Sequence, residues 1–95
     1  MLDHRTETFM TVCNVMNYRE AAELLHITQP AVTQHIQFLE KEYGCRFFLY
    51  ENRKLIKTPS AQMLEEHLRS AQQRENFLRE KLKNNQNPPF FSKNT

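Results

Sequence analysis

Residues 28–44 read TQPAVTQHIQFLEKEYG, a stretch that contains the start, the apolar stripe and the end of one helix. Thr28 is a favourable helix N-cap, and Pro30 lies in the first turn, where its missing N–H costs nothing. Apolar side chains then recur at helical spacing, at Val32, Ile36, Leu39 and Tyr43. They predict the buried stripe of a helix that ends at Gly44, since glycine is the usual residue just after a helix.

The opposite face of this helix carries hydrogen-bonding groups and no charge. The side chains opposite or beside the stripe are those of Gln29, Pro30, Thr33, Gln34 and Gln37. Residues 28–39 contain no Lys, Arg, Asp or Glu, whereas an ordinary solvated face carries charges. A glutamine amide can pair with adenine N6 and N7 in the major groove, and a threonine can bond a base or a phosphate. The face favours DNA binding, with a polar surface for another protein as the alternative.

Two shorter helices are expected before this one. The first begins after the N-cap Asp3 and buries Phe9, Val12, Cys13 and Met16 at helical spacing. The second runs from about residue 18 to 25, because Asn17 followed by Glu20 resembles a capping box. Its inner face carries Ala21, Ala22 and Leu25, of which the small alanines permit close approach of another helix. The second and third helices predict a helix-turn-helix over about residues 18–37.

A small hairpin with a basic tip is expected over about residues 46–57. RFFLY (46–50) and LIKT (55–58) are strand candidates, and ENRK (51–54) is a polar turn. Residues 46–57 carry four cations and one carboxylate, a net charge of +3, whereas residues 1–25 carry a net charge of −2. Such focusing attracts a polyanion, although charge alone fits an ordinary loop equally well. Arg53 and Lys54 are expected on the DNA backbone or minor groove, and Arg19 is a phosphate-contact candidate.

A long helix is expected over residues 59–83, capped by Thr58 with Pro59 in its first turn. One seam alternates in steps of three and four residues, at Ala61, Leu64, Leu68, Ala71, Glu75, Leu78 and Leu82. Such a helix would be about 37 Å long and would overhang so small a core. Part of the seam is therefore predicted to pair with a second copy. The expected division is a DNA-binding domain (1–58), a dimerisation helix (59–83) and a flexible tail (84–95).

The stretch AAELLHITQPAVT (21–33) resembles the N-terminal domain of LysR-type transcriptional regulators. The resemblance extends over about residues 2–83 and includes Phe9-x-x-Val12, Ile36, Leu39-Glu40, Gly44 and Arg46-Phe47-Phe48. It implies a mostly α-helical winged helix-turn-helix, with a three-helix core, a two-stranded wing and a linker helix that pairs two subunits. The expected DNA-binding set is Arg19, Thr28, Gln29, Pro30, Ala31, Thr33, Gln34, Gln37, Arg53 and Lys54.

The family regulates bacterial transcription, is usually dimeric and often tetrameric, and has a C-terminal effector-binding domain. The resemblance therefore implies duplex DNA with inverted half-sites as the partner, and we expect this chain to be a fragment without the effector domain. The sequence departs from the family at four positions. Tyr50 stands where arginine is usual, Gln34 and Gln37 where basic residues are common, and Ala61 where glycine is usual. These changes suggest weaker backbone binding or an unusual operator.

Composition restricts the other classes of protein. With 95 residues, 39% hydrophobic and 25% charged, the chain is expected to be one globular domain. No apolar run approaches the roughly 18 residues of a membrane span, and residues 1–7 are polar, so we expect a cytoplasmic protein without membrane attachment. Cys13 and Cys45 are expected to be reduced, and the four histidines show no metal-ligand spacing with them. No nucleophile pattern or phosphate-binding glycine loop occurs, so neither enzymatic activity nor a cofactor or metal is expected.

Two other interpretations remain open at this level. The first is a coiled-coil dimerisation or adaptor protein whose helix-turn-helix does not bind DNA, which the modest net charge of +2 and the loss of arginine at Tyr50 support slightly. The second is a related winged-helix regulator, such as the molybdate-responsive regulators.

Overall fold

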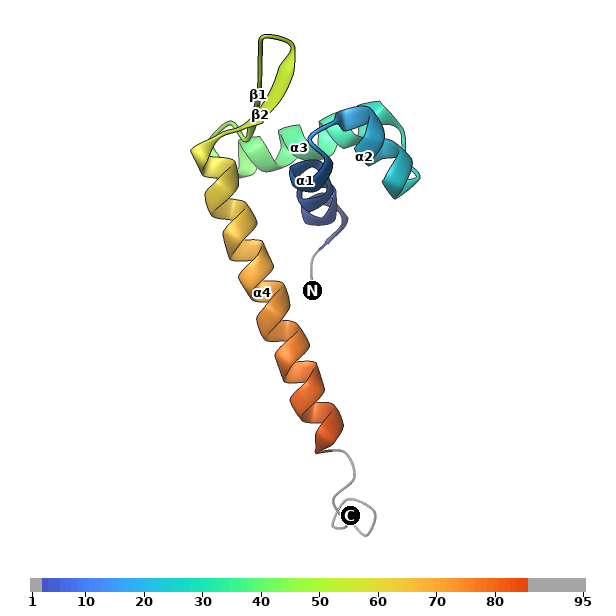
Figure 1. Ribbon diagram of the computed structural model, residues 1–95, viewed down its shortest axis with the longest axis vertical. Coiled ribbons are helices and arrows are strands. Elements are labelled where there is room, and N and C mark those ends of the chain that lie inside the picture. The colour runs from blue at the N-terminus through green and yellow to red at the C-terminus, as the bar shows by residue number, and fades with distance from the viewer. Residues whose placement is uncertain (1–2, 86–95) are drawn as a thin grey trace.

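The computed structural model describes residues 3–85 as three short helices, a hairpin and one long helix (Figure 1). The elements in chain order are α1 (His4–Val15), α2 (Tyr18–Leu25), α3 (Gln29–Tyr43), β1 (Phe48–Glu51), β2 (Lys54–Lys57) and α4 (Pro59–Asn84). This architecture confirms the predicted mostly α-helical winged helix-turn-helix.

Each helix begins at a side chain that caps its free N–H groups. Asp3 Oδ1 accepts from the backbone N–H groups of Arg5 and Thr6, and Asn17 Oδ1 accepts from that of Glu20 at 2.8 Å. The hydroxyls of Thr28 and Thr58 accept from the N–H groups three residues on, at 3.2 and 3.1 Å. All four caps occupy the residues predicted from the sequence. Each contributes about 1 kcal/mol to the stability of its helix.

The first three helices end at residues in the left-handed backbone region. The φ angles are 51° at Met16, 59° at His26 and 70° at Gly44. The backbone N–H of Ile27 then donates to the carbonyl of Ala22 at 3.1 Å, which closes the turn between α2 and α3. These tight endings fold α2 and α3 back on α1 as a helix-turn-helix.

The core lies where α1, α2 and α3 meet the first strand and the start of α4. Its fully buried large side chains are Phe9, Val12, Val32, Ile36 and Phe47. The rings of Phe9 and Phe47 meet edge to face, with centroids 5.1 Å apart. Burying a side chain of this size stabilises the fold by about 1.5–3 kcal/mol. The buried alanines of α2 let α2 approach its neighbours closely.

The wing and α4 are joined directly to this core. β1 and β2 pair antiparallel, with Glu51 opposite Lys54, and the turn consists of residues 52 and 53 alone. The hydroxyl of Thr58 donates to the carbonyl of Arg46 at 2.6 Å, which closes the base of the hairpin. From there α4 runs away from the other helices (Figure 1).

Three local predictions were wrong. Tyr43, predicted to be buried, is 56% exposed, because it lies in the last turn of α3, beyond the part that packs on α1 and α2. Met16 is only half-buried, since it is the C-cap of α1. The first strand begins at Phe48 and not at residue 46, because the N–H of Phe47 donates to the Glu40 carboxylate at 2.8 Å.

The strand and turn boundaries shift accordingly, to 48–51, 52–53 and 54–57. The predicted tail, residues 84–95, lies almost wholly outside the described residues. Among residues 3–85, no helix combines the length and apolarity needed to cross a membrane.

Candidate nucleic-acid interface

The outward face of α3 is open to solvent. Gln29, Pro30, Gln34 and Gln37 are exposed and line one shallow hollow with the half-buried Thr33. Of the other predicted contact residues, Thr28 is exposed and uses its hydroxyl as the helix cap, and Ala31 is half-buried. The structure therefore brings the predicted α3 residues together on one accessible surface.

This face also stays uncharged near neutral pH, although His35 stands between Gln34 and Gln37 in the sequence. The hydroxyl of the buried Thr8 donates to the His4 carbonyl and so accepts from His35 Nδ1, 2.8 Å away. Burial, together with the nearby His4 and Arg5, lowers the pKa of His35. The ring is therefore turned toward α1 and neutral, and it adds no charge to the glutamine surface.

The wing tip holds two cations, Arg53 in a strained turn and Lys54 at the start of β2. Asn52 and Arg53 both have positive φ, 50° and 63°, as a two-residue hairpin turn of type I′ requires. Asparagine tolerates this region, whereas for arginine this backbone conformation costs about 1–2 kcal/mol of free energy. Arg53 and Lys54 are exposed and make no ion pair with any residue of the described chain. The wing tip therefore presents both charges to solvent.

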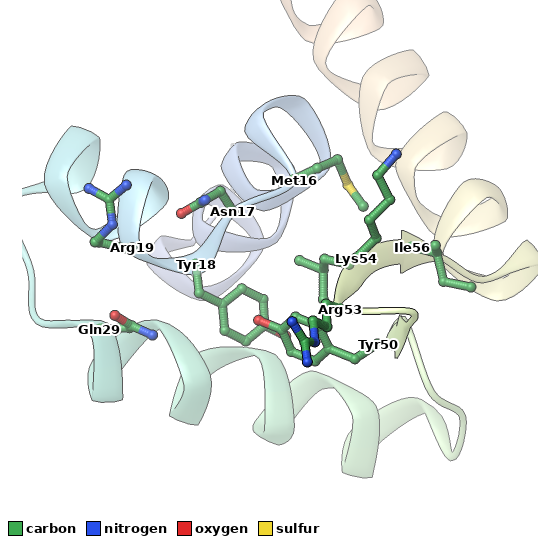
Figure 2. Close-up of a pocket in the computed structure, with 10 residues that line it drawn as sticks. Met16, Asn17, Tyr18, Arg19, Gln29, Tyr50, Arg53, Lys54 and Ile56 are labelled. Atoms are coloured by element: carbon green, nitrogen blue, oxygen red, sulfur yellow. The ribbon is translucent and has the colours of Figure 1, made fainter.

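A second hollow lies between the start of α2, the start of α3 and the wing (Figure 2). Its lining includes Arg19 of α2 with the N-cap Asn17, Gln29 of α3, and Arg53 and Lys54 of the wing. No carboxylate lines it. Arg19 also pairs with Glu23 at 3.1 Å, but both side chains are about two-thirds exposed. An exposed pair of this kind contributes only about 0.3–0.5 kcal/mol, so Arg19 remains available to another anion.

Two tyrosines line this hollow that were not among the predicted contact residues, although Tyr50 was noted as a departure from the family. Tyr18 points from the start of α2 toward the wing, where Tyr50 and Arg53 lie (Figure 2). Tyr50 is 67% exposed. Tyr18 stacks edge-on against Phe48 with ring centroids 6.3 Å apart. No local sequence pattern marks Tyr18, because its place beside the wing arises only when residues 30 positions apart in the chain come together.

The predicted seam of α4 divides into two parts. Ala61 and Leu68 are buried in the chain's own core, and Leu64 packs on that core. Further along, Ala71 and Glu75 are half-buried, and Leu78 and Leu82 are 51% and 56% exposed. Ala61 and Leu68 therefore stabilise the single chain, and the exposed apolar part of the seam begins beyond them.

Glu65 ties the wing to α4. Its carboxylate accepts from Lys57 Nζ of β2 at 2.9 Å and from the guanidinium of Arg69. Burial raises the pKa of Glu65, but the hydrogen bonds and charges of Lys57 and Arg69 outweigh burial and hold that pKa below its usual value. The side chains of Glu65 and Lys57 are 14% and 25% exposed, so water screens this ion pair less than the pair with Arg69, whose side chain is half exposed.

The described residues show no set of three His, Cys, Asp or Glu side chains placed to hold a metal. Cys13 and Cys45 are free thiols, and burial raises the pKa of Cys13 to about 12. A thiol with so high a pKa is a poor nucleophile at neutral pH.

Comparisons with known proteins agree with this geometry. Residues 4–62 match the family of bacterial regulatory helix-turn-helix proteins described as the lysR family. The chain is 40% identical over 57 residues to YxjO of Bacillus subtilis (strain 168), an uncharacterized HTH-type transcriptional regulator. That match covers 60% of this chain and 20% of YxjO, so the chain spans about a fifth of that relative's length.

Solved structures also share the fold, and two of them illustrate this. A transcriptional regulator of the LysR family from Eggerthella lenta DSM 2243 is 56% identical, with a TM-score of 0.69, and the match covers 72% of this chain and 97% of that one. The CbnR_DBD–DNA complex is 23% identical, with a TM-score of 0.74, and the match covers 87% of this chain and 95% of that one. At that identity, the second likeness shows the fold alone.

Proposed function

The chain belongs to the lysR family of bacterial regulatory helix-turn-helix proteins, and on that premise we propose that it binds duplex DNA sequence-specifically to regulate transcription. In this proposal α3 enters the major groove, and the wing contacts the adjacent backbone or minor groove. The protein acts in the bacterial cytoplasm as a regulator and not as an enzyme. The observation that carries the proposal is the exposed, uncharged, amide-rich face of α3.

The α3 face has the chemistry that base edges require. The exposed amides of Gln29 and Gln34 each carry a donor and an acceptor, which match adenine N6 and N7. The hydroxyl of Thr33 can bond a base or phosphate, and its methyl group can meet a thymine methyl. Because no carboxylate lies on this face, nothing on it repels the phosphates. These three residues are the proposed centre of base recognition, flanked by Pro30, Ala31 and Gln37, with Thr28 at the helix start.

The wing supplies sequence-independent attraction. Arg53 and Lys54 project from the wing tip without ion-pair partners in the described chain, and each can neutralise a phosphate and release a counterion. Arginine also enters a narrow minor groove favourably. Arg19 is proposed to contact a phosphate on the α2 side. Membership of a family of bacterial regulatory helix-turn-helix proteins supports DNA as the partner.

We propose a homodimer formed through the far half of α4. That half exposes Leu78 and Leu82, and these apolar side chains lie beyond the reach of the core. Ala71 and Glu75 complete the proposed seam, in which Glu75 is paired with Arg79 at 3.0 Å in the single chain. A two-fold dimer requires two half-sites in inverted orientation.

The alternative is an adaptor that dimerises through α4 without binding DNA. The exposed apolar residues of α4 would serve either role, so they do not distinguish the two functions. The salt dependence of binding distinguishes them, because the logarithm of a DNA-binding protein's affinity falls linearly with the logarithm of the salt concentration.

The test begins with selection of bound sites from random duplexes, followed by titration of the selected duplex at several salt concentrations. Gln29→Ala should weaken specific binding by about 1–3 kcal/mol and relax base choice at one position. Gln73→Ala is the matched control, because Gln73 is an exposed glutamine on α4 and lies outside both hollows described above. Failure to enrich any site, together with binding that does not respond to salt, would favour the adaptor.

A further inference from the structure

The hollow beside the wing has a polar lining that the proposed base-reading face does not use. Tyr18 and Tyr50 come from two different elements and line the same concavity as Arg53 (Figure 2). The concavity adjoins the α3 face, because Gln29 lines both hollows. A duplex whose major groove holds α3 would therefore pass its sugar–phosphate backbone over this second hollow.

Both tyrosine hydroxyls are free to bind a ligand. Within residues 3–85, neither hydroxyl takes part in a hydrogen bond, and no buried side-chain oxygen or nitrogen lacks a partner. The hydroxyl of the half-buried Tyr18 must therefore reach solvent, which it does through the hollow. The hydroxyl of Tyr50 belongs to an exposed side chain on β1.

The hydroxyl of Tyr18 also has the protonation state of a donor. Burial, with the nearby Glu40 and Tyr50, raises the pKa of Tyr18 to about 12. Tyr18 is therefore a neutral O–H donor across the physiological range. Its ring is fixed edge-on against Phe48, so the hydroxyl is held in place before any ligand arrives. A fixed donor loses little conformational entropy on binding.

The charges around these donors suit an anion. Arg53 stands on the wing side of the hollow and Arg19 on the α2 side, and no carboxylate lines the space between them. Tyrosine hydroxyls and arginines are both common donors to DNA phosphates. A base edge is a less suitable ligand, since it presents donors as well as acceptors.

We propose that this hollow binds one backbone phosphodiester of the DNA, with the hydroxyls of Tyr18 and Tyr50 as donors and Arg53 as the counter-charge. The proposal rests on the DNA-binding function proposed above. The phosphate contact fixes the depth and register of α3 in the major groove, because Tyr18 is held on the core that also supports α3. Tyr18 and Tyr50 are thus positioning residues for base reading.

The test combines two tyrosine variants with neutralised phosphates. Tyr18→Phe and Tyr50→Phe each remove one hydroxyl and retain the ring, and Tyr43→Phe is the matched control on an exposed tyrosine outside the hollow. The full chain is titrated by fluorescence anisotropy against its selected duplex and against duplexes in which single phosphates are replaced by uncharged methylphosphonates. Thermal unfolding of each variant checks that the fold is unchanged.

We expect Tyr18→Phe and Tyr50→Phe each to lose about tenfold in affinity, the lower end of a hydrogen bond to a charged group. The salt slope should stay as in the wild type, since no charge is removed. At one phosphate in each half-site, the losses of binding free energy from the methylphosphonate and from the Phe substitution should not add, because both changes remove the same contact. Tyr43→Phe should bind as the wild type does.

Several outcomes would overturn the phosphate site. Wild-type affinity in both hollow variants, or full additivity at every phosphate, would show that no phosphate lies there. Stabilisation by inorganic phosphate without DNA, lost in Tyr50→Phe, would assign the hollow to a free anion instead. If the wild type itself failed to bind duplexes in a salt-dependent way, the proposed function would fail. If it bound them normally and only the tyrosine effects were absent, the phosphate site alone would fail.

Discussion

Replacing Arg53 by glycine should separate the stability of the wing from its function. Arg53 has a φ of 63° at the second position of the two-residue turn. Its side chain makes no hydrogen bond or ion pair within the described residues, so the substitution would remove no polar contact of that side chain. No such contact therefore offsets the backbone strain.

The expected gain in stability follows from two opposing contributions. An L-residue in the left-handed region costs about 1–2 kcal/mol, which glycine avoids. Glycine loses more backbone entropy on folding, and this costs about 0.5–1 kcal/mol. The midpoints of these two ranges differ by about 0.75 kcal/mol, which is the expected rise in the free energy of unfolding. For a domain of this size, that corresponds to a rise of about 3–6 °C in Tm.

DNA binding should change in the opposite direction. The variant removes one cation from the wing, so the slope of log affinity against log salt should fall by about 0.9. Affinity should fall for all sequences alike, because a backbone contact carries no sequence information. Thermal unfolding and salt titration of the same preparation measure the two effects together.

Asn52→Gly is the matched control, since it changes the other residue of the same turn without changing charge. Asparagine already tolerates positive φ, so its gain in stability should be smaller and its salt slope unchanged. The reasoning fails if Arg53→Gly lowers Tm, or if it leaves the salt slope at the wild-type value.

Three further results are expected. His26→Gly should raise the free energy of unfolding by about 0.5–1 kcal/mol, because the exposed His26 caps α2 with a φ of 59°; a lower Tm on calorimetry would contradict this. Glu65→Gln should destabilise the domain by about 1–3 kcal/mol at neutral pH, because Lys57 and Arg69 lose their shared partner. Since the folded pKa of Glu65 lies below its ordinary 4.5, its contribution is present above pH 4.5 and is lost as the pH falls through the lower value, so urea unfolding of the two proteins should converge in acid. Leu78→Asp should sediment as a monomer and keep the wild-type Tm on thermal unfolding, whereas Leu68→Asp should unfold the domain. A dimer that survives Leu78→Asp would contradict pairing through this part of α4.

The helix starts were predictable because each depends on a few adjacent residues. Asp3, Asn17, Thr28 and Thr58 cap their helices through hydrogen bonds to residues two or three positions on, so the local sequence contains both partners. Ala21, Ala22, Val32 and the other stripe residues followed from helical periodicity in the same way. Tyr43 did not, because periodicity says which face a residue occupies but not whether a neighbour covers that part of the helix.

The contacts between distant segments were not predictable from the sequence. Tyr18 meets the wing only because the chain folds back between them, and Glu65 pairs with Lys57 across the junction of β2 and α4. The seam of α4 is a clear case. Its spacing is continuous from Ala61 to Leu82, yet the N-terminal part of the seam is buried in the core and its last leucines are exposed. A heptad pattern shows which face of a helix is apolar. Whether that face packs on the chain's own core or on another chain depends on how far along the helix the core extends.

This division of α4 bears on how two subunits would read one operator. The buried Ala61 and Leu68 fix α4 on the core, and the Lys57–Glu65–Arg69 cluster fixes the wing on α4. The proposed reading helix, the wing and the α4 helix that carries Leu78 are therefore all joined to one core. In the proposed dimer, the distance between the two copies of α3 is then set by how the far halves of α4 pair, and half-site spacing becomes a property of that pairing. A substitution that alters the pairing without unfolding the domain should change the preferred spacing and leave the half-site sequence as it was.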